Sequence, residues 1–457
     1  MMDSYAEQDA PAQDWASGPG TPVALTAAAR RVLAVLAALA DAETPVAVIA
    51  AHADISSAAA LRHLQHLTRL ALAEPGKADP ATYRAAPGPS PLHPAELTAA
   101  GHGRAATWHL ACAFEAARVL GAAALPDREL IPRDPQRPPR IPADRFTALA
   151  WFAAERDGSL VRELERAGEL GHDELAWRLA LLMLNIACFA GPWHGWRRVH
   201  EYGSAAARRA GHRGAQAMIE EYAGKLELTG GNPAAARARH QMSLEIRTAD
   251  GDLRELVRSV NALGVTFLRE GSLPEAEALF EQALGLALDS GDREFADFAR
   301  MNIAAVHART GRGGQAIEQL QSVVGSLRSA GREVYVANAL EDLAAAYRAE
   351  GDLIRALETA LEAEAAAVEA GVPTFLAGPL IEQARIHVER GDLRLALACL
   401  GEAHAIYEDL GDPLRAGLVA AQFDRIFLDQ AANEADHPDP ASRRPYRTEA
   451  APVAKVK

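Results

Sequence analysis

The sequence predicts an all-α protein, built as a right-handed superhelical solenoid of repeats about 40 residues long and preceded by a small separate domain. Glycines recur every 40 residues in two interleaved series, and apolar residues between them follow the period of an α-helix. Hydrophobic residues make up 49% of the chain but aromatic residues only 5%. The apolar content is therefore mostly Ala and Leu, which favours closely packed helices over sheets.

The two glycine series, which we call the glycine ladder, divide the chain into pairs of helices of roughly 17 residues each. Each glycine is predicted to take the left-handed conformation that ends a helix, and the Asp or Asn that often follows is predicted to cap the next one. The first series marks the predicted repeat starts at 171, 211, 251, 291, 331 and 371, and position 411 begins a final helix over 411–430. The second series lies at 191, 231, 271, 311, 351 and 391.

One unit carries a motif that resembles the tetratricopeptide repeat (TPR), lengthened to about 40 residues. The motif consists of Leu263, Gly264, Phe267, Gly271, Ala276, Phe280 and Ala283. Its second-helix alanine returns every 40 residues from Ala236 to Ala396, whereas Trp196 occupies this place in the first unit. Because one such hairpin cannot bury its apolar faces alone, neighbouring hairpins are expected to stack into a solenoid with a concave and a convex surface.

Residues 21–121 are predicted to form a winged-helix-like domain. Apolar positions define helices around Leu33 and over Val46–His52, and Ser56 or Ser57 is placed to cap a third helix. Thr82-Tyr83-Arg84 completes a short hairpin wing.

The amino-acid composition predicts the character of the remaining segments. Six prolines in 122–145 predict an extended linker, the solenoid is expected over 146–430, and the tails 1–20 and 431–457 are expected to be disordered.

The entry to the solenoid resembles the helical arm of actinobacterial NB-ARC-type STAND regulators and of SARP-class antibiotic regulators. The matching residues are Ala148, Trp151 and Glu155, then Gly171, His172, Ala176, Trp177, Leu179 and Ala180. Ser159-Leu160 stands where that family usually has Asn-Leu. In these regulators a winged helix precedes the arm, which agrees with the order predicted here. The family's phosphate-binding loop, G-x-x-x-x-G-K-[ST], is not found in this sequence, so nucleotide binding is not carried over.

Bulk properties narrow the function further. A formal charge of −14 argues against a chain-wide nucleic-acid or anionic-membrane surface. Cys112, Cys188 and Cys399 lie far apart in helical stretches, which is typical of buried thiols in a reducing compartment. No apolar run is long enough to cross a membrane and no secretory leader is recognisable, so we expect a cytoplasmic protein. We expect no metal, cofactor or catalytic residue, since no G-x-S-x-G, H-E-x-x-H or C-x-x-C motif occurs.

The first functional hypothesis is recognition of a protein or peptide on the concave surface. Arginine pairs with carboxylates, and asparagine bonds both the N–H and the C=O of a peptide backbone. The alternative is that these polar residues only line a solvated face. The phase of Leu263-Gly264 places on this surface Arg178, Asn185, Glu221, Lys225, Arg258, Asn261, Arg269, Met301, Arg309, Asn338, Glu341, Arg348 and Arg385.

The second hypothesis is direct, sequence-specific DNA binding by the winged helix, whose third helix offers Arg62, His63, His66 and Arg69. A homodimer would double these contacts. Both hypotheses fit a regulator of transcription or of a biosynthetic cluster in which partner binding to the solenoid changes how the winged helix is presented. A third alternative, an enzyme of a biosynthetic pathway, rests on the aromatic and imidazole side chains between Trp193 and His200.

Overall fold

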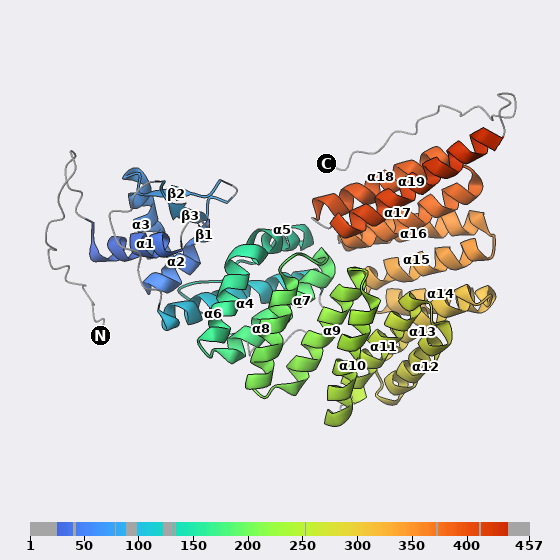
Figure 1. Ribbon diagram of the computed structural model, residues 1–457, viewed down its shortest axis with the longest axis horizontal. Coiled ribbons are helices and arrows are strands. Elements are labelled where there is room, and N and C mark those ends of the chain that lie inside the picture. The colour runs from blue at the N-terminus through green and yellow to red at the C-terminus, as the bar shows by residue number, and fades with distance from the viewer. Residues whose placement is uncertain are drawn as a thin grey trace.

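The computed structural model describes residues 25–39, 43–77, 79–87, 98–121, 131, 134–251, 253–371, 373–410 and 413–436. Figure 1 shows a small N-terminal unit, followed by helices that stack in series and sweep round in one arc to the C-terminal helix. The predicted tail over 1–20, residues 437–457 of the other tail, and the ladder glycine at 411 lie outside the described residues.

The N-terminal unit consists of three helices and a small antiparallel sheet of strand order β1-β3-β2. Its core is formed by Val32, Leu36, Ile49, Leu64 and Leu67. Ser56 caps the third helix by accepting a hydrogen bond from the N–H of Ala59 at 3.2 Å. The elements are α1 (Ala27–Ala38), β1 (Thr44–Pro45), α2 (Val46–Ala53), α3 (Ser57–Arg69), β2 (Ala73–Pro75) and β3 (Thr82–Ala85).

Helix α4 (Ala99–Leu120) joins this unit to the solenoid, because it packs against both α2 and α7. The described part of the proline-rich segment also packs, whereas a separating linker was expected there. The Pro138 carbonyl accepts a bond from the Trp108 indole, and the N–H of Arg140 bonds to the Cys112 sulfur. Prolines prevent helix formation in this segment, but they do not prevent its side chains from being buried.

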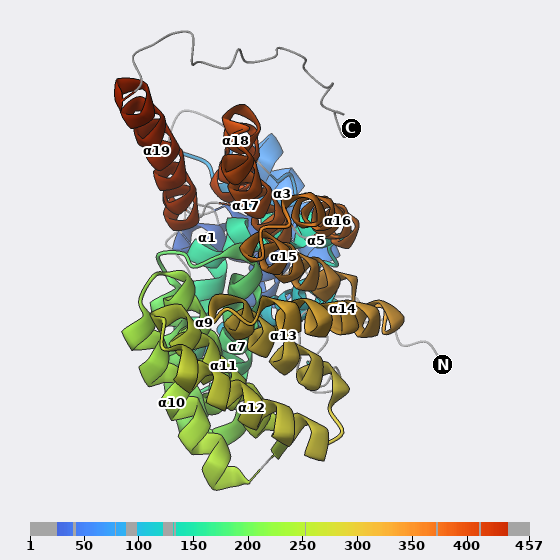
Figure 2. The same ribbon diagram turned by 90° about the vertical axis from the view of Figure 1, so that its right-hand side faces the viewer.

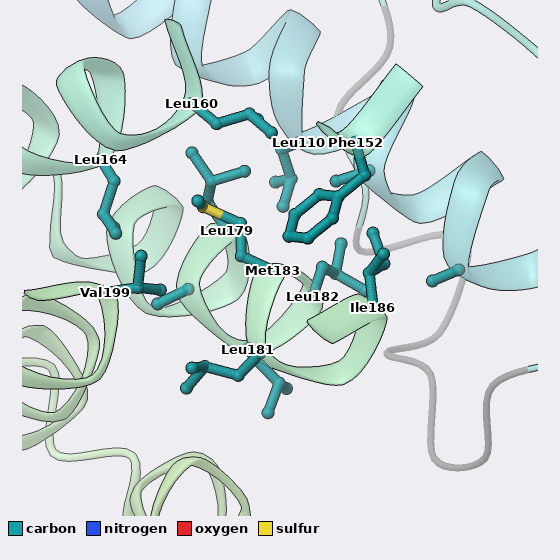
Figure 3. Packing of buried hydrophobic residues seen from close by; sticks show 14 of the residues in the cluster. Leu110, Phe152, Leu160, Leu164, Leu179, Leu181, Leu182, Met183, Ile186 and Val199 are labelled. Atoms are coloured by element: carbon teal, nitrogen blue, oxygen red, sulfur yellow. The ribbon is translucent and has the colours of Figure 1, made fainter. Parts of the chain in front are cut away.

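The entry to the solenoid is one interrupted rod made of α5 (Arg145–Glu155), a π-helical turn (Arg156–Leu160) and α6 (Val161–Glu169). Asp144 and Thr147 form a reciprocal capping box at its start. Figure 3 shows how Phe152 and Leu160 of this rod meet Leu110 of α4 and a row of residues on α7, including Leu179 and Met183, in one continuous core.

The solenoid itself is a series of antiparallel helices in which each packs on the next. Its helices are α7 (Asp173–Ala190), α8 (Trp196–Arg209), α9 (Arg213–Thr229), α10 (Pro233–Asp250), α11 (Leu253–Glu270), α12 (Leu273–Asp289), α13 (Arg293–Arg309), α14 (Gly313–Ser329), α15 (Glu333–Ala349), α16 (Leu353–Ala370), α17 (Pro373–Arg390), α18 (Leu393–Asp409) and α19 (Pro413–Asp436). The architecture is the TPR-type solenoid that the sequence predicts.

The glycine ladder behaves as predicted. Every described glycine of both series has a positive φ, for example +70° at Gly291 and +80° at Gly351. The predicted caps are confirmed at Asp292 and Asp352, whose carboxylates accept bonds from Phe295 and Arg355. Asp392 makes no such side-chain bond.

The C-terminal helix α19 extends to Asp436, past the end at 430 that the sequence suggested and into the segment expected to be disordered. Within the part of the chain that the structure describes, none of the helices combines the length and the apolar character needed to cross a membrane.

The arc nearly closes on itself. Phe189 at the end of α7 meets Phe375 at the start of α17 edge-to-face, with ring centroids 6.4 Å apart. Leu410, which follows α18, packs against the core formed by α4 to α9. Figure 2, turned by 90°, shows α11, α13, α15 and α17 following one another upward in one stack. The inner surface is therefore crowded by helices that are far apart in sequence.

Candidate functional site

The inner surface of the superhelix gathers charged side chains from α9, α11, α13, α15 and α17. Their mutual electrostatic effects show that they share one space: Lys225 and Arg258 both act on Tyr335, and Arg269 and Arg309 both act on Asp342. Each of these interactions links helices that are not neighbours in the chain. We call this set the inner surface.

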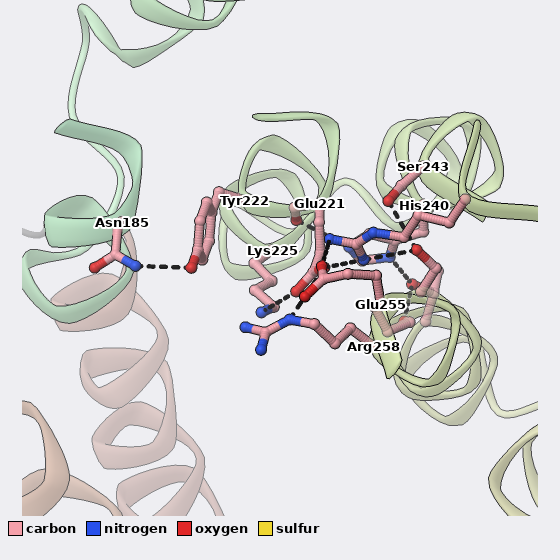
Figure 4. Close-up of polar contacts among 12 residues, drawn as sticks. Asn185, Glu221, Tyr222, Lys225, His240, Ser243, Glu255 and Arg258 are labelled. Carbon is pink, nitrogen blue, oxygen red and sulfur yellow. Dashed lines mark hydrogen bonds and ion pairs between the residues drawn. The ribbon is translucent and has the colours of Figure 1, made fainter. Parts of the chain in front are cut away.

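At one end of the inner surface, Glu221 of α9 is the centre of a buried ionic network (Figure 4). Its carboxylate lies 2.6 Å from Lys225 Nζ, 2.6 Å from Arg247 Nη1 and 4.0 Å from Arg258 Nε. Burial alone would raise the pKa of Glu221, but the three cations hold it well below its usual range. Glu255 also pairs with Arg247. Three cations thus face two carboxylates, which leaves an excess positive charge.

A cavity of about 90 Å³ adjoins this network. Its lining includes Lys225, Arg258 and Asn261, with Val265 and Phe295 as an apolar wall. The Arg258 guanidinium stacks over the Phe295 ring at 5.0 Å. Glu221, Lys225, Arg258 and Asn261 of this lining were among the residues named from the sequence, whereas His240 and Phe295 were not. An aromatic residue on a solenoid helix cannot be distinguished from a core residue by its position in the pattern.

Asparagine side chains continue the inner surface. The Asn302 amide donates to the Asn261 side-chain oxygen at 2.8 Å, which joins α13 to α11. Asn302 was not identified from the sequence, although it lies 41 residues after Asn261, one repeat and one position further on. Asn185 donates to the Tyr222 hydroxyl at 2.8 Å and is buried, so the structure uses it to join α7 to α9.

We call the other end of the inner surface the acidic end, because a cluster of carboxyl groups lies there among arginines. Burial, aided by the neighbouring Asp342 and Glu382, raises the pKa of Glu341 to about 8. Burial likewise raises the pKa of Asp342 to about 7, opposed by Arg269 and Arg309. Three carboxyl groups on α15 and α17 therefore share a crowded space, and part of the charge of Glu341 and Asp342 is suppressed near neutral pH.

The remaining predicted residues are partly engaged by the protein itself. Arg348 bonds Glu382 at 2.6 Å and Glu389 at 2.7 Å, and Arg385 bonds Glu382 at 3.0 Å. Arg178 pairs with Glu174. Asn338 and Met301 lie on α15 and α13, half-buried and buried respectively. The structure thus brings Lys225, Arg258, Asn261, Arg269, Arg309 and Glu341 together, and leaves Arg178 at the entry of the solenoid.

Helix α3 presents a separate polar face. Arg62 and Arg69 are exposed and His66 is half-buried, and they recur at helical spacing with no acidic residue between Ser57 and Ala73. His63 is half-buried on the same helix.

Trp193, His194 and His200 have different surroundings. Trp193 packs edge-to-face on Phe152 at 5.3 Å, and His200 Nε2 lies 3.0 Å from Glu220 inside the solenoid. His194 is exposed. These residues serve packing and helix pairing, which offers no support to the enzyme hypothesis.

A different cluster escaped the sequence pattern altogether. His52 of α2, His102 of α4 and Glu163 of α6 converge at the junction between the N-terminal unit and the solenoid, all buried. No local spacing predicts this, because Glu163 lies 111 residues after His52.

Comparisons with known proteins place the chain among structures of related architecture. No protein-family model matches the sequence, and none of the curated proteins matches it. A Rap protein complexed with competence and sporulation factor is similar over 59% of this chain and 80% of its own, at 13% identity and a TM-score of 0.47. NprR in complex with its cognate peptide NprX is similar over 65% of this chain and 93% of its own, at 12% identity and a TM-score of 0.44.

A third similar structure is a signal transduction ATPase with numerous domains (STAND) from Pyrococcus horikoshii that has a tetratricopeptide repeat sensor. It covers 86% of this chain and 65% of its own, at 15% identity and a TM-score of 0.39.

Proposed function

We propose that the chain is a peptide- or protein-binding regulator that holds an extended segment of its partner against the inner surface. The observation that carries this proposal is the polarity of that surface. Lys225 and Arg258 line a small cavity at one end, and Glu341 and Asp342 lie at the other. A surface that only needed to be solvated would not have to enclose carboxyl groups whose pKa values are raised, or hold more cations than carboxylates beside a cavity.

The arrangement defines the chemistry of the ligand. A carboxylate, either an acidic side chain or a chain terminus, fits between Lys225 and Arg258, with apolar contact to Phe295. Asn261 is placed beside them to bond peptide groups. A basic side chain fits the acidic end, where it would favour the ionised form of Glu341 and Asp342. We therefore propose a peptide with an acidic group and a basic group separated by a few residues.

The proposal is tested by selecting peptides from a random display library on the full-length protein and measuring their affinity by fluorescence anisotropy. Lys225→Ala and Asn261→Ala are expected to weaken binding about tenfold or more, which corresponds to about 1.4 kcal/mol. Arg213→Ala is the matched control, because Arg213 forms an exposed ion pair with Asp250 at 2.6 Å, away from the cavity.

Two results would count against the proposal. The first is a selection that enriches no peptide. The second is a set of enriched peptides that bind the two inner-surface variants as tightly as the unaltered protein.

A second candidate function, DNA binding by the N-terminal unit, rests on the acid-free face of α3. We propose that α1 to α3 and the β-sheet form a winged helix, and that Arg62 and Arg69 contact phosphates while His66 faces the major groove. The resemblance to STAND and SARP-class regulators, stated on the residues of the solenoid entry, agrees with a role in transcription or in control of a biosynthetic cluster.

DNA binding is checked by anisotropy with duplexes from the regions upstream of neighbouring genes, at several stated salt concentrations. Arg62→Ala with Arg69→Ala should weaken binding to all duplexes and flatten the salt dependence by about two phosphate contacts. Equal binding to every sequence, or no binding at moderate salt, would reject this role.

A further inference from the structure

The buried junction between the N-terminal unit and the solenoid holds a cluster that neither proposed function uses. His52 Nε2 lies 3.5 Å from Glu163 Oε1, and His102 Nδ1 lies 3.0 Å from Glu163 Oε2. The side chains of His52 and Glu163 are 0% exposed and that of His102 is 6% exposed. Three elements, α2, α4 and α6, therefore each direct one side chain into the same enclosed space.

The spacing of these atoms suits a small divalent metal ion. One ligand atom from each residue lies within 4.8 Å of the other two. Tetrahedral zinc with bonds of about 2.0–2.2 Å keeps its ligand atoms roughly 3.3–3.6 Å apart. The distance of 3.5 Å from His52 to Glu163 falls within this range, and the distance of 3.0 Å from His102 to Glu163 lies just below it. The two imidazole rings meet edge-to-face with their centroids 4.7 Å apart, so both rings face the same carboxylate.

The charge of the cluster also points to a cation. Among the described residues, the ion pairs of Glu163 are only those with His52 and His102, so no Lys or Arg neutralises this fully buried carboxylate directly. Leaving such a charge without a counter-charge is costly. A cation held by the two imidazole nitrogens and the carboxylate would supply that counter-charge.

We propose that His52, His102 and Glu163 bind one zinc ion, which fastens α2 of the N-terminal unit to α4 and α6 at the entry of the solenoid. Two imidazole nitrogens and one carboxylate oxygen form a ligand set that zinc accepts, with a fourth position left for water. The ion ties together segments separated by up to 111 residues in the chain. It thereby fixes the orientation of the N-terminal unit relative to the inner surface.

The test uses the full-length protein, stripped with a chelator and titrated with zinc chloride by isothermal calorimetry, with bound metal measured by mass spectrometry. We expect one equivalent of zinc with at least micromolar affinity and a higher melting temperature with zinc present. Cobalt(II) in place of zinc should give the visible absorption of a tetrahedral site.

Glu163→Gln keeps the volume of the side chain but removes its charge, and should weaken zinc binding about 100-fold or more and abolish the rise in melting temperature. His102→Gln serves as a second variant should the first one misfold, which circular dichroism will show. His194→Gln is the matched control, because His194 is exposed and remote from the cluster in sequence.

The proposal is overturned if the unaltered protein binds no stoichiometric zinc and shows no tetrahedral cobalt spectrum. It is equally overturned if folded Glu163→Gln or His102→Gln protein binds zinc as tightly as the His194→Gln control. Because the readout is metal content, neither result bears on peptide binding by the inner surface.

Discussion

At the scale of single residues, Gly264 shows how closely the helices of one hairpin approach each other. A Cβ atom at this position would lie 2.6 Å from Cε1 of Phe280, a fully buried ring on the next helix. Gly285, on the exposed side of α12, has no atom within 4 Å of the corresponding position. The same substitution therefore has opposite consequences at two helical glycines of one repeat.

We predict that Gly264→Ala destabilises the protein by about 1–3 kcal/mol through overpacking. Gly285→Ala is the control and should stabilise it by up to about 1 kcal/mol, since alanine favours the helix. Thermal unfolding followed by circular dichroism measures both. Equal melting temperatures for the two variants would contradict the close packing of Gly264 on Phe280.

The acidic end of the inner surface gives a prediction about pH. The pKa of Glu341 is raised to about 8 in the folded protein, whereas a glutamate in an unfolded chain titrates near about 4.3. Between these two values the folded state binds more protons than the unfolded state, so stability falls as pH rises through this window.

Glu341→Gln removes this titration, so the variant should lose less stability than the unaltered protein between about pH 5 and about pH 8. Denaturant unfolding at both pH values measures the difference. Glu358→Gln, an exposed position on α16, is the control and should retain the original pH dependence. A Glu341→Gln variant with unchanged pH dependence would mean that this carboxyl group titrates normally.

At the scale of helices, buried ion pairs connect neighbouring helices and fix their relative positions. Glu221 of α9 pairs with Arg247 of α10, which is 2% exposed, and lies near Arg258 of α11. One carboxylate thus fixes the relative positions of three successive helices. Exposed pairs such as Arg213 with Asp250 link α9 and α10 as well, but solvent screens them.

Glu221→Ala is predicted to cost about 3–5 kcal/mol of unfolding free energy, because it leaves Arg247 and Arg258 without their main counter-charge. Asp250→Ala, which breaks the exposed pair, should cost less than about 1 kcal/mol. Urea unfolding of both variants provides the measurement. A similar small loss for both would show that the network around Glu221 adds little.

The helices could be predicted from the sequence because their signals are local. A glycine such as Gly291 and the capping Asp292 beside it report the end of one helix and the start of the next, whatever the tertiary structure. Lys225, Arg258 and Asn261 were assigned to one surface from the same phase; they line one cavity, and their contact with a partner stays a prediction. What the sequence did not reveal are contacts between distant segments, such as His52 with Glu163.

The proline-rich segment illustrates a further limit of the sequence. Proline reports that a helix is absent, but burial depends on what the rest of the chain offers. Arg137 of this segment is 5% exposed and donates to the carbonyl of Ile55 at 2.9 Å, which holds the segment against the start of α3. A proline-rich segment that separates two domains and one that packs against them can have the same amino-acid composition.

At the scale of the whole molecule, helices far apart in the chain meet through an aromatic pair. Phe189 and Phe375 meet across the opening, and an edge-to-face pair of this kind contributes about 0.5–1.5 kcal/mol beyond the area it buries. Because α7 and α17 are separated by the whole length of the arc, this pair limits how far the two ends can move apart.

Phe189→Ala is predicted to open the superhelix while its helices remain folded. Small-angle X-ray scattering should give a larger radius of gyration, and amide hydrogen exchange should increase at the start of α17. Leu395→Ala, an exposed position on α18 at 52% exposure, is the control and should leave both unchanged. An unaltered radius for Phe189→Ala would mean that other contacts maintain the closed form.

The π-helical turn between α5 and α6 has a consequence for changes in chain length. A π turn contains one residue more than an α turn, so it absorbs a surplus residue while Phe152 before it and Glu163 after it both face inward. Deleting the exposed Gly158 would convert this turn into a regular one and leave both flanks in register. A deletion within α6 would instead rotate every later side chain of that helix by about 100°. The protein is thus expected to tolerate the loss of one residue at the π-helical turn. A melting temperature of the Gly158 deletion variant close to that of the intact protein would verify this.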